Sequence, residues 1–345
     1  MKERNANAGI RRYAPMIGVA AAVVVFYLAI EYLRQARVLT PYYVQILMFG
    51  LLNCMVTLGL NLINGITGQF SIGQAGFVAV GAYSSAAVTT LLFEFNKLPT
   101  ALQPLVFLFA VCVGGFVAGI FGYLIGRPSL RVKGDYLAIV TLGFGEIIRS
   151  LIRYIEVVGG PRGLPGIPQY VGVRGGGLAW VLFFFTLTVW FLRNYIYSFR
   201  GRACVSCRED ELAAETMGVN TTTYKVQAFI VGAVTAGAAG ALQAHIIGFI
   251  HPDQFSYVRS TDFLVYLYAG GAGTMSGAII GAMSLTIVLE VLRFLADWRL
   301  VIYGVVLVLM MLYQPNGICN GKEFPFLVPK LKATATSSKA EGVGQ

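Results

Sequence analysis

Charged residues are scarce in this chain of 345 residues. Asp, Glu, Lys and Arg make up 12% of the sequence, whereas they account for roughly a quarter of an average soluble domain. Hydrophobic residues make up 57%. The composition therefore excludes an ordinary soluble enzyme or binding module, and it predicts an integral membrane protein.

Residues that bind metals are also few, with 2 histidines and 5 cysteines in the whole chain. Cys204 and Cys207 form a C-x-x-C pair in a basic segment, but a structural zinc ion needs four ligands. The two histidines, His245 and His251, lie on another segment. We therefore expect no metal and no cofactor. We also expect no membrane enzyme, because no cluster of His, Cys and acidic residues supports one.

A nucleotide-binding loop is missing as well. The nearest candidate, "GICNGKE" at 317–323, lacks the spacing and the final Ser or Thr of G-x-x-x-x-G-K-[ST]. No soluble stretch exceeds a few dozen residues, which leaves no room for a separate catalytic or nucleotide-binding domain. If ATP hydrolysis drives this protein, the ATPase is another chain.

Long apolar runs dominate the sequence instead, and runs of about 18 or more nearly uncharged residues predict transmembrane helices. We expect an all-α polytopic bundle of about ten such helices, with broken or short helices near 64–76 and 259–277. The first run is too long for a signal peptide and has no cleavage site, so we expect a retained helix. The expected spans are 16–33, 44–64, 72–92, 104–126, 135–156, 178–198, 224–248, 259–272, 277–296 and 299–314.

The net charge of +10 comes from Lys and Arg in short segments between the apolar runs, which argues against nucleic acid as a partner. The clusters lie near residues 2–12, 127–133, 200–208 and 322–339. The positive-inside rule places all four in the cytoplasm. We therefore expect cytoplasmic termini, with 1–15 as the N-terminal segment, 16–314 as the membrane domain and 315–345 as a tail that is disordered after about 330.

A polar, glycine-rich stretch at 59–83 joins the second and third expected spans. Its glycines give a small helical face that lets helices pack closely. Its polar side chains have two interpretations, polar contacts between helices or the lining of a water-filled route, because unpaired polar groups are costly in hydrocarbon. The packing candidates here are Gly68, Gly73, Gly76 and Gly81, and the route candidates are Asn61, Asn64, Gln69, Ser71 and Gln74.

A second glycine-rich stretch at 266–284 joins the eighth and ninth spans. Gly273, Gly277 and Gly281 recur every four residues, which is a small-xxx-small packing pattern. The eighth span is short, and discontinuous helices of this kind mark substrate pathways in transporters. Helix packing explains the glycines themselves without a functional role.

Two pairs of charged residues lie within expected spans. Glu146 and Arg149 are three residues apart, as are Glu290 and Arg293. The two residues of each pair therefore lie on one helix face and can neutralise each other's charge. All four lie toward the outer ends, where long side chains reach water. Structural ion pairs are the simpler interpretation, although charged groups within a membrane are functional candidates by default.

The longest cytoplasmic segment before the tail runs over 200–223. Residues 208–218, "REDELAAETMG", predict a short helix with acidic residues in its first turn. Gly218 is suited to end that helix. A small alanine face beside charged flanks favours docking into a groove on a partner. An amphipathic helix lying on the membrane is the weaker alternative, since large apolar residues are few.

Five strings carry a resemblance to a known family. "ELAAETMG" (211–218) resembles the E-A-A-x-x-x-G coupling motif of ABC importer permeases, with Leu212 inserted. The wider segment 201–229 resembles the branched-chain amino-acid ABC transporter permease family, in particular its LivM type. So do "GQFSIGQAGFVAVGAY" (68–83), "LRVKGDYLAIVTLGFGEIIR" (130–149), "GGPRGLPGI" (159–167) and "QPNGI" (314–318). The resemblance spans about residues 45–320.

The resemblance implies a permease subunit, not an enzyme, of an importer in the bacterial inner membrane. It implies as partners a second, LivH-like permease, two cytoplasmic ATPases, an extracytoplasmic substrate-binding protein and membrane lipid. The expected ATPase-coupling residues are Arg208, Glu209, Asp210, Glu211, Ala213, Ala214 and Gly218. They would move as a rigid lever when the ATPases close.

The transported solute remains open at this point. Branched-chain or related amino acids are the leading expectation, and urea, short amides or other small solutes are the alternative within the family. An autonomous channel or secondary carrier is less favoured, because such a protein does not require a docking segment.

Overall fold

The computed structural model describes residues 30, 40–93, 99, 101–130, 136–171, 177–295, 298–314 and 317–324. The expected N-terminal segment, the first expected span apart from Ile30 and the tail beyond 330 lie outside these residues. Within them the chain is almost entirely helical, with one pair of very short antiparallel strands.

The long helices follow the expected apolar runs in order. They are α2 (Pro41–Leu60), α3 (Gln74–Ala87), α4 (Gln103–Ser129), α5 (Tyr136–Tyr154), α6 (Gly177–Ile196), α9 (Thr221–Ile247), α10 (Tyr257–Gly270), α11 (Met275–Val291) and α12 (Trp298–Tyr313). Two π-helical turns extend α2 and α3, at η1 (Asn61–Ile66) and η2 (Val88–Leu92). Short helices α7 (Phe199–Glu209) and α8 (Glu211–Thr216) lie between α6 and α9.

The remaining elements belong to the connections at one end of the bundle. They are the 3₁₀ turns η4 (Glu156–Val158), η5 (Gly160–Arg162), η7 (Pro252–Phe255) and η8 (Leu292–Leu295), and the strands β1 (Leu164–Pro165) and β2 (Phe249–Ile250). Leu164 pairs with Ile250 and Pro165 with Phe249. This pairing fixes the 159–167 loop against the connection between α9 and α10.

In the described part of the chain, 6 helices are long and apolar enough to cross a membrane. They are Pro41–Ile66, Gln74–Leu92, Gln103–Ser129, Gly177–Ile196, Thr221–Ile247 and Met275–Phe294. The helices α10 and α12 are shorter, with 14 and 16 residues, and α5 contains three charged side chains. The chain is therefore a multi-pass helical membrane protein.

Helix α9 packs against α3 and α4 at the centre of the bundle. A methyl group on Gly81 of α3 would lie 2.1 Å from the carbonyl oxygen of Gly237 on α9, and one on Gly240 would lie 2.1 Å from the carbonyl oxygen of Val78. The backbones of α3 and α9 are therefore in direct contact. Such contact is how helices associate strongly where water supplies no hydrophobic driving force.

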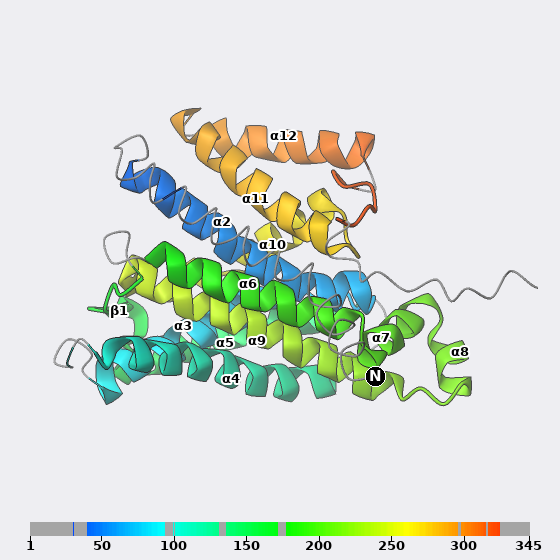
Figure 1. The fold of residues 1–345 in the computed structure, drawn as a ribbon, viewed down its shortest axis with the longest axis horizontal. Helices are drawn as coiled ribbons and strands as arrows, with labels where there is room; N and C mark the ends of the chain where they lie inside the picture. Colours follow the sequence, from blue (N-terminus) through cyan, green and yellow to red (C-terminus); the bar gives the residue numbers. More distant parts are fainter. Residues whose placement is uncertain are drawn as a thin grey trace, which may run out of the picture.

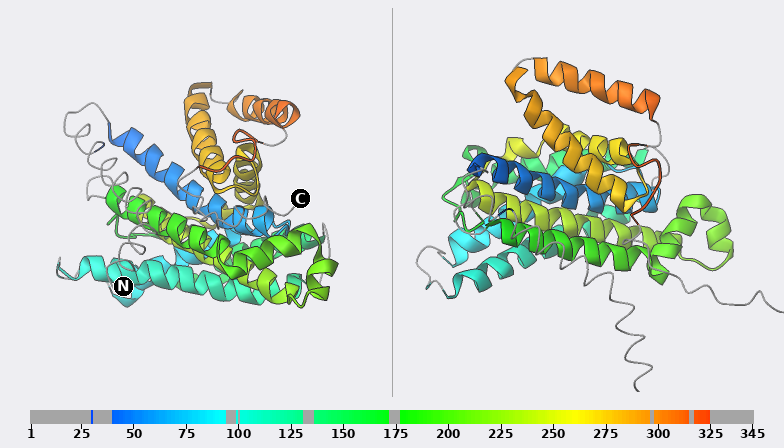
Figure 2. Two further views of the ribbon diagram at one scale, coloured as in Figure 1. Left: turned by 45° about the vertical axis from the view of Figure 1, so that its right-hand side comes forward. Right: turned by 45° about the horizontal axis from the view of Figure 1, so that its top comes forward.

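The two ends of the bundle differ. In Figure 1, α7 and α8 project at one end of the long helices and β1 lies at the opposite end. The two further views in Figure 2 show the same separation, with α8 extending beyond the ends of the long helices. Helix α12 lies on the side of α11, away from α4 (Figure 1).

Candidate coupling site

The expectation of one short helix over 208–218 is wrong in its bounds. Arg208 and Glu209 form the last turn of α7, and Asp210 has an extended backbone (φ −155°, ψ 113°) that separates α7 from α8. The Asp210 carboxylate accepts a hydrogen bond from the Ala213 N–H at 3.0 Å, which caps α8. The segment therefore consists of two helices with a sharp corner, and Asp210 shapes that corner.

The end of α8 is closed by Gly218, which has φ +81°. The Gly218 N–H donates to the Glu215 carbonyl at 2.9 Å, and the Val219 N–H donates to the Ala214 carbonyl at 3.0 Å. These two bonds form a Schellman motif, whose left-handed residue is usually glycine. The turn directs the chain from α8 straight into α9.

Helix α8 is tied to the first turns of α9. The Lys225 ammonium lies 2.6 Å from the Glu211 carboxylate, and the Thr221 hydroxyl donates to the Glu215 carboxylate at 2.8 Å. Ala214 is buried, whereas Leu212 and Met217 are 72% and 84% exposed. Helix α8 therefore holds its small face against the membrane domain and presents apolar side chains outward.

The first helix break lies between η1 and α3, at residues 67–73. The side-chain amide of Asn61 accepts a hydrogen bond from the Gly273 N–H at 2.8 Å and donates to the Thr274 carbonyl at 3.0 Å. Asn64 makes a reciprocal pair with the backbone of Ser71, both bonds at 3.2 Å. Both amides therefore replace backbone hydrogen bonds that the break has removed.

Two glutamines of this stretch reach α9 instead. Gln69 donates to the Lys225 carbonyl at 3.3 Å, and Gln74 donates to the Gly232 carbonyl at 3.1 Å. Within the described residues, three buried atoms here have no hydrogen-bond partner, namely Gln69 Oε1, Gln74 Oε1 and the Ser71 hydroxyl oxygen. The five route candidates are all buried, so this conformation holds them against protein.

The second break lies between α10 and α11, at residues 271–274. Thr274 caps α11 by accepting from the Gly277 N–H at 3.2 Å. Glu323, far along the chain, accepts from the Met275 N–H at 2.6 Å. A carboxylate at a helix N-terminus is favoured by the free N–H groups and the helix dipole. The sequence analysis did not single out Glu323, although it follows the "QPNGI" string closely.

The seven packing glycines divide into two kinds. Gly68 and Gly273 lie within the breaks and have positive φ angles of 73° and 88°, which only glycine adopts readily. Methyl groups on the other five would lie 3.0 Å or less from backbone atoms of a neighbouring segment. These five are Gly73 and Gly76 against α5, Gly81 against α9, and Gly277 and Gly281 against α10 or the residue that follows it.

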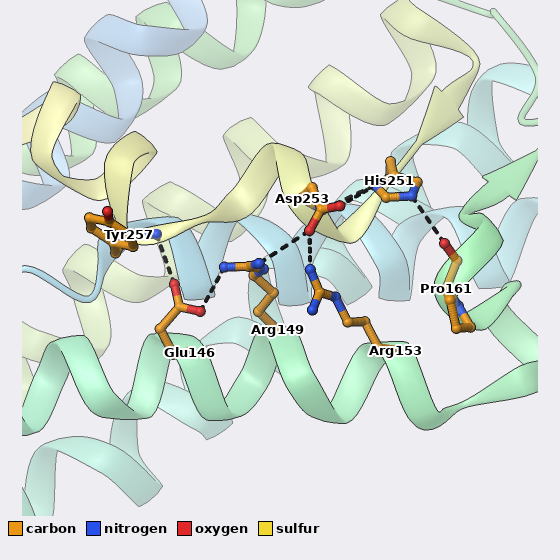
Figure 3. Close-up of polar contacts among 7 residues, drawn as sticks. All are labelled: Glu146, Arg149, Arg153, Pro161, His251, Asp253 and Tyr257. Carbon is orange, nitrogen blue, oxygen red and sulfur yellow. Dashed lines mark hydrogen bonds and ion pairs between the residues drawn. The ribbon is translucent and has the colours of Figure 1, made fainter.

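The charged residues in the C-terminal half of α5 form a network with the α9–α10 connection (Figure 3). Arg149 lies 2.7 Å from Glu146 and 3.2 Å from Asp253, and Arg153 also pairs with Asp253. Glu146 accepts from the Tyr257 N–H at 2.8 Å. The hydrogen bond from Arg153 holds the pKa of Asp253 below its ordinary value.

Asp253 was not among the predicted site residues, because its partners are 100 and 104 residues away in sequence. His251 extends the same network, since its Nε2 lies 3.0 Å from the Pro161 carbonyl. The second predicted pair, Glu290 and Arg293, is 3.1 Å apart, and Tyr42 of α2 contacts both side chains. Both pairs therefore join neighbouring helices, in addition to neutralising their own charges.

Cys204 and Cys207 are buried on the inner face of α7. Burial raises the pKa of both thiols above the ordinary value, which disfavours the reactive thiolate. Within the described residues, no group of three or more His, Cys, Asp or Glu side chains is placed to hold a metal ion. The pair fills space between α7 and its neighbours.

Comparisons with known proteins bear on the whole membrane domain. The chain is 31% identical over 328 residues to the high-affinity branched-chain amino acid transport system permease protein LivM of Salmonella typhimurium, covering 86% of this chain and 73% of the relative. It is 24% identical over 294 residues to LivH of the same organism, covering 78% and 91%. It is 30% identical over 226 residues to the autoinducer 2 import system permease protein LsrC of Yersinia pseudotuberculosis, covering 61% and 62%.

No solved structure matches the chain significantly. The family model described as the branched-chain amino acid transport system / permease component matches residues 42–312. That range contains both helix breaks, α7 and α8. The chain therefore belongs to the family of branched-chain amino acid transport system permease components.

Proposed function

We propose that this chain is the permease subunit of an ABC importer that carries branched-chain or related amino acids across a bacterial inner membrane. The observation that carries the proposal is the family match over residues 42–312. A separate feature supports it, because α7 and α8 project from one end of the bundle as a docking element requires (Figure 1). The subunit itself hydrolyses no ATP.

The chain crosses the membrane about ten times, with both termini in the cytoplasm. The six long apolar helices supply most of the crossings, and α5, α10, α12 and the apolar run at 16–33 supply the others. The position of α7–α8 opposite β1 supports this topology, since the basic 200–208 segment is then cytoplasmic. The 159–167 loop then faces the extracytoplasmic side.

The subunit works with a second, LivH-like permease, two cytoplasmic ATPases and an extracytoplasmic substrate-binding protein. The relatives LivM and LivH are both named as permeases of a high-affinity branched-chain amino acid transport system, which supports a pair of permeases. ATP binding closes the ATPases, and their movement displaces α8. Because Glu211 and Glu215 bind the first turns of α9, α9 follows that displacement.

Docking on the ATPase uses the outer surface of α8 and its corner. Leu212 and Met217 are the large apolar side chains of α8 and its C-terminal cap that face outward, and such side chains suit a hydrophobic groove. Asp210 and Gly218 give α8 its ends, Ala214 is its buried inner residue and Glu211 holds it to α9, whereas Ala213 is exposed beside Leu212. Arg208 and Glu209 lie on α7, on the membrane side of the corner.

The substrate route runs beside the first break, with Asn61, Asn64, Gln69, Ser71 and Gln74 as candidates for its lining. Three unpaired polar atoms in this stretch support the proposal, because buried polar atoms cost about 1–3 kcal/mol each when unsatisfied. Neutral amides can guide a zwitterionic amino acid without holding it too tightly. Thiol labelling of single-cysteine variants at these five positions tests the route, and complete inaccessibility at all five would contradict it.

A second candidate is import of another small solute by the same kind of complex. The match to LsrC, named as an autoinducer 2 import permease, favours keeping this alternative. Urea and short amides are the alternative solutes that the family resemblance implies. An uptake experiment separates the candidates. The complex with its ATPases and binding protein is reconstituted in liposomes, and ATP-driven uptake of leucine, valine, urea and acetamide is compared.

Uptake of leucine or valine that requires ATP and the binding protein is the expected result. Uptake of urea or acetamide alone would favour the second candidate. Uptake without ATP would contradict an ABC importer and favour a channel or secondary carrier.

Two substitutions test the coupling site in the same complex. Ala214→Arg places a guanidinium in the contact between α8 and the membrane domain, and Gly218→Pro removes the left-handed turn. Both should abolish uptake while the affinity of the binding protein for substrate stays unchanged. Arg202→Met, on the exposed face of α7, is the control. Normal substrate-stimulated ATP hydrolysis in the two variants would refute the assignment.

A further inference from the structure

The two helix breaks form a single joint. Asn61 in η1, the turn that leads into the first break, binds Gly273 and Thr274 in the second break at 2.8 and 3.0 Å. A methyl group on Gly65 would lie 2.4 Å from the Gly273 nitrogen, so the two backbones touch. Neither break can rearrange without losing hydrogen bonds that the other supplies.

Arg208 enters this joint from the last turn of α7. Its guanidinium Nη1 donates to the Gly65 carbonyl at 2.9 Å. Its aliphatic stem lies over Gly68, where a methyl group would be 2.7 Å from the arginine Cγ. The same Nη1 would lie 3.4 Å from a methyl group on Gly273. One side chain therefore packs against the first break and lies beside the second.

The chemistry of these contacts suits a cation with several donors. The Gly65 carbonyl belongs to the C-terminal end of the helix formed by α2 and η1, where the last carbonyls lack helical partners and the dipole favours positive charge. Glu209 accepts from the Nε and Nη2 of Arg208 at 3.1 and 2.5 Å. That pairing fixes the guanidinium plane and leaves Nη1 directed at Gly65.

A second link runs from α8 to the same break. Glu211 binds the Lys225 ammonium, and the Lys225 carbonyl accepts from the Gln69 side chain at 3.3 Å. The two links start on either side of the Asp210 corner; one ends at Gly65 in η1 and the other at Gln69 in the first break. Only the Arg208 link also lies beside the second break.

We propose that Arg208 is a positioning residue that transmits movement of α7 and α8 to the joint between the two breaks, and that it is not a contact with the ATPase. The proposal rests on the proposed function, because it presupposes ATPases that move α8. In this proposal one side chain, that of Arg208, passes the movement of α7 and α8 to the membrane helices.

The test uses the complete complex with three variants. Arg208→Met keeps the stem and removes the charged donors, Arg208→Lys keeps the charge and a donor, and Arg202→Met is the matched control on the exposed face of α7. Three quantities are measured: co-purification of the ATPases, hydrogen exchange of residues 61–73 and 271–277 with and without ATP, and solute taken up per ATP hydrolysed.

We expect Arg208→Met to retain its ATPases while the ATP-dependent change in exchange at 61–73 and 271–277 is lost. Uptake per ATP should fall by about tenfold, which corresponds to the loss of one strong interaction from the coupling step. Arg208→Lys should recover part of both effects, and Arg202→Met should match the unmodified complex. If Arg208→Lys recovers part of the lost coupling, the defect in Arg208→Met comes from the missing charged donor and not from a general loss of structure.

Two results would overturn the proposal. Loss of the ATPases from Arg208→Met would make Arg208 a docking contact, and an unchanged exchange response would show that the joint moves without it. The proposed function fails differently, since the unmodified complex would then show no ATP-driven uptake of any solute. The exchange measurement does not depend on which solute is carried, so it tests the role of Arg208 in any complex whose ATPases respond to ATP.

Discussion

The contact between α3 and α9 gives a sharp prediction for a single methyl group. In Gly81→Ala, the new Cβ would lie 2.1 Å from the Gly237 carbonyl oxygen and 2.4 Å from the Gly237 Cα. Both are backbone atoms of α9, so no side-chain rotation can relieve the overlap. The helices can accept the methyl group only by moving apart along the centre of the bundle.

The expected magnitude combines two opposing terms. Replacing glycine by alanine inside a helix gains up to about 1 kcal/mol of helix propensity. Overpacking a close contact costs about 1–3 kcal/mol, and more where the backbone must shift. At Gly81 the steric cost lies at the upper end, so we expect a net destabilisation of about 2 kcal/mol.

The matched control is Gly143→Ala on α5, where nothing lies within 4 Å of the added methyl group. Only the propensity gain applies there, so we expect no loss of stability and a gain of at most about 1 kcal/mol. The free energy of unfolding of the purified protein is measured in mixtures of mild detergent and SDS, with circular dichroism as the probe. Equal stability of the two variants would refute the reasoning that α3 and α9 touch through their backbones.

Two further predictions concern the joint and the ion-pair network around Asp253. Asn61→Leu leaves the Gly273 N–H without its partner, whereas the Thr274 carbonyl keeps the Ala278 N–H as a donor. We expect a loss of about 1–3 kcal/mol for the one unsatisfied group in the same unfolding assay, whereas Asn194→Leu on the exposed face of α6 should cost little. Arg153 holds the pKa of Asp253 below its ordinary value of 3.8, so the stabilisation from this carboxylate is complete above that value and is lost as pH falls through the lower, folded-state pKa. Asp253→Asn should therefore lower the thermal midpoint at pH 7 and should differ less from the unmodified protein as the pH falls below about 4; an unchanged difference across that range would contradict the role of the ion pairs.

The long helices could be predicted because apolar length alone determines them. The runs at 104–126 and 224–248 correspond to α4 and α9 within a few residues at each end. Helix α7 was not predicted, because its buried face consists of small or sulfur-containing residues rather than large apolar ones. Gly201, Cys204 and Cys207 form that face, and their spacing of three residues carries little hydrophobic signal.

For the polar residues of the 59–83 stretch, the sequence predicted two alternative roles, contacts between helices or the lining of a water-filled route. The sequence places Asn61 and Gln74 in an apolar context, which demands partners without identifying them. Their partners are backbone groups 212 and 158 residues away, and no local pattern specifies contacts over such separations. The same limit applies to Arg208, which was predicted as a coupling residue from its place in the segment; its bond to the Gly65 carbonyl, 143 residues away, has no local signal.

The helix breaks themselves follow from one physical requirement. A break in a membrane leaves backbone groups that neither lipid nor water can satisfy, so side chains or another backbone must do so. Here the two segments bind each other through Asn61, and Arg208 from α7 and Glu323 near the second break each bind a further backbone group. Two of these three partners are charged residues that reach the breaks from outside the membrane helices. A movement of α7 that withdraws Arg208 would therefore leave the Gly65 carbonyl without this donor.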